Sequence, residues 1–168
     1  LSHAVRDLAH QHLVDFYDAN RARLDEHSLA VLDQVKALID PSKSGMPPVY
    51  IVALDLRSGQ VPMAAVGYGH LDTADNLTWQ VPGMESDADA GLENWGRASK
   101  NLYSEQEKLA QRSGLGTVGV IAFLSYDTPD FSDSVDLSTG GLKAGPNSVL
   151  SPNLARQGAA RLAAELDG

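Results

Sequence analysis

The residues best placed to do chemistry lie around a Pro-Gly turn. Residues 77–81 have the composition of a short strand, and the chain then runs through Pro82-Gly83-Met84 towards a long polar helix. Pro82 fixes φ and has no backbone donor, whereas Gly83 lets the backbone turn sharply and be approached closely. A strand that ends in such a turn leaves backbone N–H groups at the carboxyl edge of a sheet, where α/β proteins place their chemistry. The alternative is an ordinary connection, since Pro-Gly pairs mark many turns.

Four aspartates flank this turn, Asp72 and Asp75 before it and Asp87 and Asp89 after it. They could act as a metal cluster or as an acid–base pair. Aspartate at turns and helix starts more often caps backbone groups and complements the helix dipole. We therefore expect the first two to build an Asx-type turn that leads into the strand. His70 precedes them near the predicted sheet edge, and no nucleophile is paired with it.

Other residue patterns lack the context that their chemistry requires. Gly114 to Gly119 spells the dinucleotide fingerprint Gly-x-Gly-x-x-Gly, but it follows a predicted helix and runs into a strand. Nucleotide binding needs the reverse order, so that the pyrophosphate meets a helix N-terminus. No Gly-x-Ser-x-Gly nucleophile elbow occurs, and the nearest serine, Ser148, lacks the following glycine and the preceding strand. We therefore predict no cofactor.

Histidines near the start of the chain suggest a metal site, and helix geometry argues against it. His3, His10 and His12 lie in a predicted helix. His10 and His12 point about 200° apart on a helix and cannot share a metal from one face. We expect these histidines to be solvated or half-buried, and we predict no metal.

Composition limits the classes of function. With 168 residues one domain is expected, and the absence of cysteine excludes disulfides, thiolate metal sites and a cysteine nucleophile. A net charge of −9 argues against nucleic acid or an anionic membrane as a partner. No apolar run approaches the roughly 18 residues of a membrane span, and no signal peptide opens the chain. Composition does not fix the compartment. Because the sequence starts at Leu1 rather than Met and ends abruptly, we expect part of a longer protein.

The first elements form a helical leader. Residues 2–18 predict an amphipathic helix with Ser2 as its N-cap and an apolar face at Val5, Leu8, His12, Leu13 and Phe16. A second helix is predicted over residues 28–39. The Pro-rich segment 41–48 then breaks the pattern. We therefore divide the chain into a leader, residues 1–45, and a body, residues 46–168.

The body alternates strands and helices. Strands are predicted at 49–56, 61–67, 77–81 and 117–126, with an excursion loop at 127–150. Helices are predicted over 88–112 and from Pro152, with Ser151 as the N-cap of the second. The first two strands are joined by four residues, which forces an antiparallel hairpin, whereas a whole helix joins the last two and allows a parallel pair.

Three segments occur in a specific order: Gly67-Tyr68-Gly69-His70-Leu71-Asp72-Thr73-Ala74-Asp75, then Val81-Pro82-Gly83-Met84, then Ile121-Ala122-Phe123-Leu124-Ser125-Tyr126-Asp127-Thr128-Pro129. In this order they resemble an actinobacterial branch of the α/β-hydrolases that is catalogued as a domain of unknown function. The resemblance covers most of residues 17–168, including Asn20-Arg21-Ala22 in the leader. One departure is that Gly-Tyr-Gly-His-Leu-Asp replaces the family's more usual Gly-Asp-Pro-Asp.

The resemblance implies an oxyanion loop formed by Gly83 and Met84, with the backbone N–H of Met84 as one donor. It also makes His70, Tyr126 and Asp127 candidates for lining the cleft. In such proteins the nucleophile, the acid and the histidine follow in that order after the next strand. By that order this sequence contains none of the three, so the resemblance implies that the chain alone is inactive.

Two functions are compatible with these observations. The first is the N-terminal portion of a serine α/β-hydrolase of the esterase or lipase type, acting on a small ester together with a missing C-terminal half, in the same polypeptide or in a second chain. The second is a non-catalytic structural or binding protein on a degenerate hydrolase fold. In both cases we expect an α/β fold: the N-terminal half of a hydrolase sheet, with an antiparallel hairpin and then parallel strands with crossover helices, preceded by the helical leader.

Overall fold

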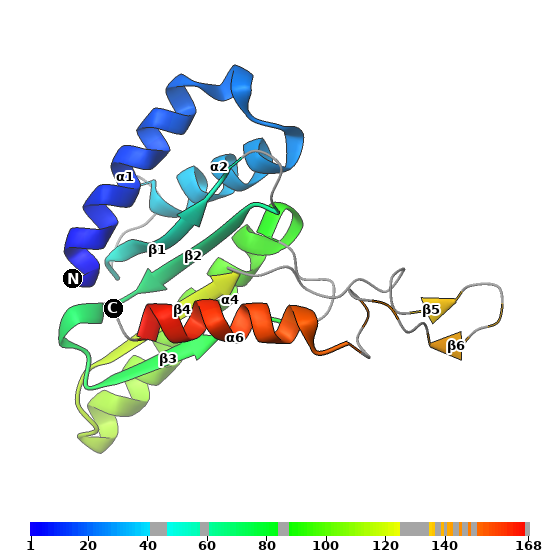
Figure 1. The fold of residues 1–168 in the computed structure, drawn as a ribbon. Coiled ribbons are helices and arrows are strands. Elements are labelled where there is room, and N and C mark those ends of the chain that lie inside the picture. The colour runs from blue at the N-terminus through cyan, green and yellow to red at the C-terminus, as the bar shows by residue number, and fades with distance from the viewer. Residues whose placement is uncertain are drawn as a thin grey trace.

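The computed structural model of the protein describes residues 1–40, 47–57, 61–83, 88–124, 135–136, 139, 141–142, 145, 148 and 151–166. Figure 1 shows how the elements are arranged. In chain order they are α1 (His3–Ala19), the 3₁₀ helix η1 (Arg21–Arg23), α2 (Glu26–Ile39), β1 (Val49–Asp55), β2 (Met63–Tyr68), the 3₁₀ helix η2 (Leu71–Thr73), β3 (Asn76–Gln80), α4 (Ala88–Ser113), β4 (Val118–Leu124), β5 (Val135–Asp136), β6 (Gly141–Leu142) and α6 (Asn153–Leu166).

The four longer strands form one mixed sheet in the order β1-β2-β4-β3. β1 pairs antiparallel with β2, β2 pairs antiparallel with β4, and β3 pairs parallel with β4. The short connection after β1 permits only a hairpin, whereas β3 reaches β4 through the whole of α4. The predictions for both pairs are confirmed, and β4 is an interior strand with a partner on each side.

Side chains that alternate along β4 belong to two cores. Val120 and Leu124 join the cluster that contains residues of α2 and α4. Ile121 and Phe123 join a second cluster on the opposite face, against which Leu162 of α6 packs. Figure 1 shows the same arrangement, with α6 in front of the sheet and α2 and α4 behind it. The fold is therefore a three-layer α/β/α arrangement.

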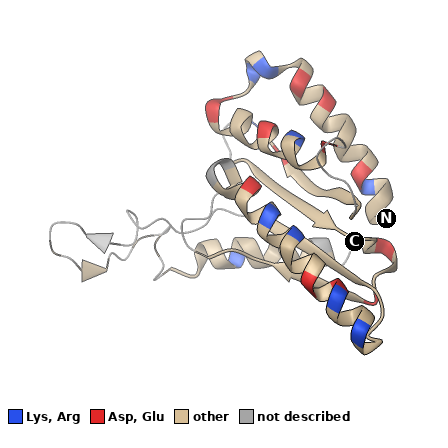
Figure 2. Ribbon diagram, turned by 180° about the vertical axis from the view of Figure 1, so that it is seen from behind, with Lys and Arg blue, Asp and Glu red and all other residues tan. Residues whose placement is uncertain are grey.

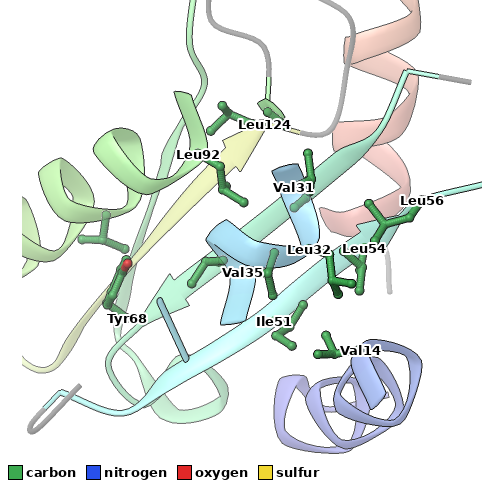
Figure 3. Close-up of a cluster of buried hydrophobic side chains, with 14 of the residues drawn as sticks. Val14, Val31, Leu32, Val35, Ile51, Leu54, Leu56, Tyr68, Leu92 and Leu124 are labelled. Atoms are coloured by element: carbon green, nitrogen blue, oxygen red, sulfur yellow. The ribbon is translucent and has the colours of Figure 1, made fainter. Parts of the chain in front are cut away.

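The second helix of the leader belongs to the same core as the sheet. Val31, Leu32 and Val35 of α2 are fully buried, and Figure 3 shows them pointing towards the strands. The helix begins at Glu26, two residues before the predicted start, and η1 separates it from α1. The leader predicted over residues 1–45 thus shares its core with the body, and the division after residue 45 stays a prediction.

Helix α1 covers the outer edge of β1 with polar side chains. β1 has a bulge between Ile51 and Ala53, and both backbone groups of Ile51 bond to α1. Asp7 Oδ1 accepts from the Ile51 N–H at 2.6 Å, and the ring Nδ1–H of His10 donates to the Ile51 carbonyl oxygen at 2.8 Å. An edge strand leaves backbone groups without partners. Here α1 provides the partners.

The apolar face predicted for α1 is wrong. The helix and its cap are confirmed, with Ser2 Oγ accepting from the Val5 N–H at 3.3 Å. The buried positions, however, are Asp7 and Val14. The side chains of the predicted face are exposed, namely Val5, Leu8, His12, Leu13 and Phe16. The reason is the position of the helix: a sheet edge requires hydrogen-bond partners, so α1 turns its polar side inward.

The carboxylate of Asp72 attaches the start of α1 to the connection between β2 and β3. Its oxygens accept from the His3 N–H at 2.5 Å and from the Ala4 N–H at 3.0 Å. Burial favours the neutral acid, but the two N–H groups outweigh it and lower the pKa of Asp72. Asp72 therefore caps a helix distant in sequence, whereas the sequence predicted a role in a local turn.

The C-terminal elements include a hairpin and a helix. β5 and β6 pair antiparallel within the predicted excursion loop. Helix α6 begins at Asn153, one residue after the predicted first position, Pro152, and the Asn153 N–H donates to the Oγ of the predicted cap Ser151 at 3.3 Å. Among the described helices, none has the length and apolar character needed to cross a bilayer.

Asp7 provides a test of the contact between α1 and the sheet edge. Removing its oxygen in Asp7→Ala leaves the buried Ile51 N–H without an acceptor, and we expect a loss of about 1–3 kcal/mol in the free energy of unfolding. Burial raises the pKa of Asp7, so the folded protein binds the proton more tightly than the unfolded chain. The stability that this tighter proton binding contributes is complete below a pH of about 4. It is lost as pH rises through the pKa of Asp7 in the folded protein.

Asp7→Asn keeps an acceptor and carries no charge. We therefore expect Asp7→Asn to gain stability relative to the wild type as pH rises from about 4 towards neutrality. Urea denaturation across this range measures the difference, with the exposed Asp15→Asn on the same helix as control. An Asp7→Ala variant as stable as the wild type, or an advantage of Asp7→Asn that shrinks with rising pH, would contradict this account.

Candidate functional site

The parallel pair β3 and β4 defines the edge at which the Pro-Gly turn lies. Asn76 pairs with Val118 at the amino end of the two strands, and Gln80 pairs with Ala122 at the other end. The chain leaves β3 after Gln80 and continues to Pro82 and Gly83, and the next described residue is the first of α4. The turn therefore follows the carboxyl end of β3, as predicted.

Helix α4 holds the end of β3 in place. The indole N–H of Trp95 donates to the Gln80 carbonyl oxygen at 3.2 Å. The hydroxyl of Ser99 donates to Gln80 Oε1, and Ser99 is fully buried. Pro82, two residues further, is buried as well. These contacts fix where the backbone leaves the sheet, so the turn starts from a rigid position.

Gly83 itself faces solvent. A Cβ on this residue would meet no atom within 4 Å, and its φ does not lie in the left-handed region. Neither crowding nor backbone conformation within the described structure requires glycine here. Close approach of a ligand to the backbone, the advantage of glycine predicted from the sequence, stays a prediction.

Several predicted site residues lie outside the described residues. These are Met84, whose backbone N–H is the predicted oxyanion donor, and Tyr126 and Asp127, the predicted lining of the cleft. The direction in which the Met84 N–H points therefore stays a prediction. The same holds for Asp87 and for the side chain of Asp89.

His70 lies at the opposite end of the strands from the Pro-Gly turn. It follows β2, and with Tyr103, Glu107 and Thr117 it lines a cavity of about 160 Å³ beside the amino end of β4. A Cβ on the neighbouring Gly69 would approach the carbonyl oxygen of Val118, the first residue of β4. The structure does not bring His70 together with Gly83, which follows the carboxyl end of β3.

Asp75 connects the start of β3 to the segment before β4. Its Oδ2 accepts from the Thr117 N–H at 2.7 Å and from the Thr117 hydroxyl at 2.9 Å, and its own N–H donates to Thr117 Oγ1 at 3.1 Å. The backbone bond from Thr117, followed by the hydroxyl, lowers the pKa of Asp75. Asp75 is thus a structural acceptor. In the part of the chain that the structure describes, no three acidic or histidine side chains gather as metal ligands.

The glycine-rich run from Gly114 to Gly119 forms the connection between α4 and β4 and the start of that strand. Gly114 and Gly116 have positive φ values of 65° and 81° between α4 and the strand. A Cβ on Gly119, inside β4, would come within 2.9 Å of Leu77 Cδ1. The run follows a helix and leads into a strand, so it presents no helix N-terminus to a pyrophosphate.

Ser148 is engaged within its own turn. Its hydroxyl donates to the Gly145 carbonyl oxygen at 3.2 Å and accepts from the Gly145 N–H at 3.3 Å. Ser148 is fully buried. Its hydroxyl bonds to backbone and to no histidine among the described residues, which is not the arrangement of an activated nucleophile.

Comparison with known families identifies the class of protein. A family model described as alpha/beta hydrolase matches residues 58–168, more than half of the chain. The chain therefore belongs to the α/β-hydrolase family, and the fold class expected from the sequence is confirmed. Searches of curated proteins and of solved structures found no match.

Sequence reasoning missed the residues that support the turn. The sequence predicts a strand at Gln80 and a helix that contains Trp95 and Ser99, but no role for these three residues at the turn. Residues four apart share one face of a helix, so Trp95 and Ser99 were a detectable pair. No pattern in the sequence indicates that Gln80 is the partner of both, because that depends on the angle at which α4 crosses the sheet.

The bond between Ser99 and Gln80 can be measured by a double-mutant cycle. Ser99→Ala leaves the partly buried amide oxygen of Gln80 without its donor, and we expect a loss of about 1 kcal/mol in unfolding free energy. In a Gln80→Leu background the same substitution should cost at least 0.5 kcal/mol less, a coupling of the order expected for direct contacts, about 0.5–3 kcal/mol. Ser104→Ala, whose hydroxyl bonds only within α4 at 3.0 Å, is the matched control. Additive effects would show that Ser99 does not hold the strand end.

Proposed function

We propose that this chain supplies the N-terminal part of a serine hydrolase of the esterase or lipase type. In this proposal the turn after β3 is the oxyanion loop, formed by the backbone of Gly83 and Met84. The nucleophile, the acid and the histidine come from a C-terminal half that continues the same polypeptide or belongs to a second chain. The substrate is a small ester. We place the protein in the actinobacterial branch that its motifs resemble.

The observation that carries the proposal is the position of the turn in a chain of this family. The family match spans the turn, β4 and α6. The turn follows the carboxyl end of a parallel strand, and Gly83 leaves its backbone open to approach. β3 is also the edge strand of the described sheet, and in this proposal a further parallel strand pairs along its outer side.

The proposed chemistry is nucleophilic acyl transfer. A serine attacks the ester carbonyl while a histidine takes its proton, and negative charge develops on the carbonyl oxygen. The Met84 N–H and the N–H of the residue after the serine donate to that oxygen. Loss of one such donor typically costs about 3–4 kcal/mol of transition-state stabilisation. The donor is a backbone group, so its position matters and the side chain at residue 84 does not.

The substitution Gly83→Val tests whether the turn is an oxyanion loop or only a connection. Because a Cβ at this position meets nothing within 4 Å, we expect the unfolding free energy to change by no more than about 0.5 kcal/mol. In the complete enzyme, the added side chain should obstruct the substrate and lower kcat by about a hundredfold or more. Gly145→Val, where a Cβ also meets nothing within 4 Å, is the control. Unchanged kcat with an unchanged melting temperature would mean that the turn is only a connection.

The 168-residue chain by itself should show no serine hydrolase activity, because the serine that comes nearest to an elbow motif, Ser148, is bonded to backbone. We expect no turnover of an activated ester and no labelling by a fluorophosphonate probe, as read by mass spectrometry of peptides. Labelling of any serine within residues 1–168 would overturn this assignment.

The complete protein, by contrast, should be labelled on a serine of its C-terminal half. Absence of labelling there would favour the non-catalytic alternative on a degenerate hydrolase fold.

A further inference from the structure

The cavity beside the amino end of β4 has hydrogen-bond acceptors in its wall and no basic side chain among the described residues that line it. Glu107 is the carboxylate of this lining, and Gln111, about one helical turn further along α4, lines it as well. His70 and Thr73 line it from the connection that follows β2. An amide oxygen, a hydroxyl oxygen and a neutral imidazole each offer lone pairs. The polar lining therefore suits a ligand that donates hydrogen bonds.

One oxygen of the Glu107 carboxylate is held by Tyr103, and the other is open. The Tyr103 hydroxyl donates to Glu107 Oε1 at 3.0 Å. Burial, followed by this bond, raises the pKa of Tyr103 to about 12, so the hydroxyl stays neutral and keeps donating near neutral pH. Glu107 Oε2 has no hydrogen-bond partner among the described residues, and it is not one of their buried unpaired atoms. Tyr103 therefore orients the carboxylate and leaves its second oxygen within reach of a ligand.

No basic side chain neutralises Glu107 in the part of the chain that the structure describes. None of the ion pairs there involves it, and Lys108, the next residue, bonds to Glu105 at 2.7 Å instead. A second carboxylate lies beside the cavity wall, since a Cβ on Gly116 would collide with Asp75. Figure 2 shows both basic and acidic positions along α4, whereas the segment around η2 has acidic positions only. The electrostatic potential at the cavity therefore favours a cation.

The size and the walls of the cavity limit the ligand. Its volume is about 160 Å³, and a water molecule occupies about 30 Å³ in the liquid, so about five non-hydrogen atoms fill it. Ala110 and Val118 supply apolar surface. A metal ion needs several side-chain ligands, and among the described residues no three acidic or histidine side chains gather. The ligand that fits is a small organic cation.

We propose that this cavity binds a small primary ammonium ion with a carbon chain of about one to three atoms. The ammonium group donates to Glu107 Oε2 and to the side-chain oxygens of Gln111 and Thr73, and the carbon chain packs against Ala110 and Val118. A bond between two charged groups is stronger than a neutral hydrogen bond, so Glu107 supplies most of the affinity. The cavity lies at the opposite end of the strands from the turn after β3, and the proposal does not depend on the hydrolase function.

The test is titration of the isotope-labelled protein with ethylammonium chloride, followed by NMR through the backbone amide signals of Gly116 and Thr117. Sodium chloride keeps the ionic strength constant. We expect saturable shifts with a Kd of about 10 mM or lower, which is reasonable for so small a ligand. Ethanol has a similar size without the charge, and tetraethylammonium has the charge without an N–H donor and is too large. Both should bind about tenfold more weakly or not at all.

Two matched variants remove one negative charge each from α4. Glu107→Gln keeps an acceptor for the Tyr103 hydroxyl and should weaken ethylammonium binding about tenfold or more. Glu105→Gln removes a carboxylate that is 72% exposed and does not line the cavity, so it should leave the Kd unchanged. Equal weakening by the two variants would show a general effect of charge and would overturn the proposal.

Gln111→Lys provides a test that does not require loss of the carboxylate. Glutamate followed by lysine about one turn later forms a favourable pair on a helix, so the ammonium of the new side chain should occupy Glu107 and abolish the saturable shifts. The proposal is overturned if this variant binds ethylammonium as the wild type does. It is equally overturned if the folded wild type shows no saturable shift at 50 mM (about fivefold above the expected Kd), or if ethanol or tetraethylammonium binds as tightly.

Discussion

The parallel pairing of β3 with β4 is the constraint on which the rest of the body depends. A parallel pair cannot be closed by a tight turn, so the chain must cross the face of the sheet before it returns. Helix α4 is that crossover, and its path determines what lies at the end of β3. Trp95 and Ser99 reach Gln80 because the helix begins beside the strand it has just left. The turn after β3 is therefore a consequence of strand topology as much as of its Pro-Gly sequence.

Helix α4 also forms a second close contact, at Gly96, a residue without a side chain. Gly96 is pressed between Leu38 and the Tyr68 hydroxyl, whereas Gly83 has free space around it. One glycine allows α4 to pack closely against α2 and Tyr68, and the other leaves the backbone accessible at a sheet edge. The two regions belong to different parts of the fold, one between helices on a face of the sheet and the other at the carboxyl edge of β3.

Helix α1 is attached to the body largely by polar contacts at the sheet edge. Asp7 and His10 bond the backbone of Ile51 at the bulge of β1, and Asp72 caps the start of α1. Desolvation of Asp7 opposes its charge, which the N–H of Ile51 offsets in part. Such an attachment requires accurate geometry, since a buried donor without its acceptor costs more than a lost apolar contact at the surface. It also explains why a helix with an apolar stripe leaves that stripe in solvent.

The sequence by itself determined the order of the longer helices and strands, the antiparallel hairpin and the parallel pair, because hydrophobic period and connection length are local properties. It also placed the Pro-Gly turn after a strand and showed that the glycine run of residues 114–119 has the wrong context for a nucleotide. Only the tertiary structure decided which face of α1 is buried, since that depends on whether the helix meets a sheet face or a sheet edge. It also separated His70 from Gly83, because the antiparallel β2 ends at the amino edge of the strand pair β3–β4. Burial of the Tyr68 hydroxyl was likewise invisible in the sequence, because it arises from the packing of α2 against α4.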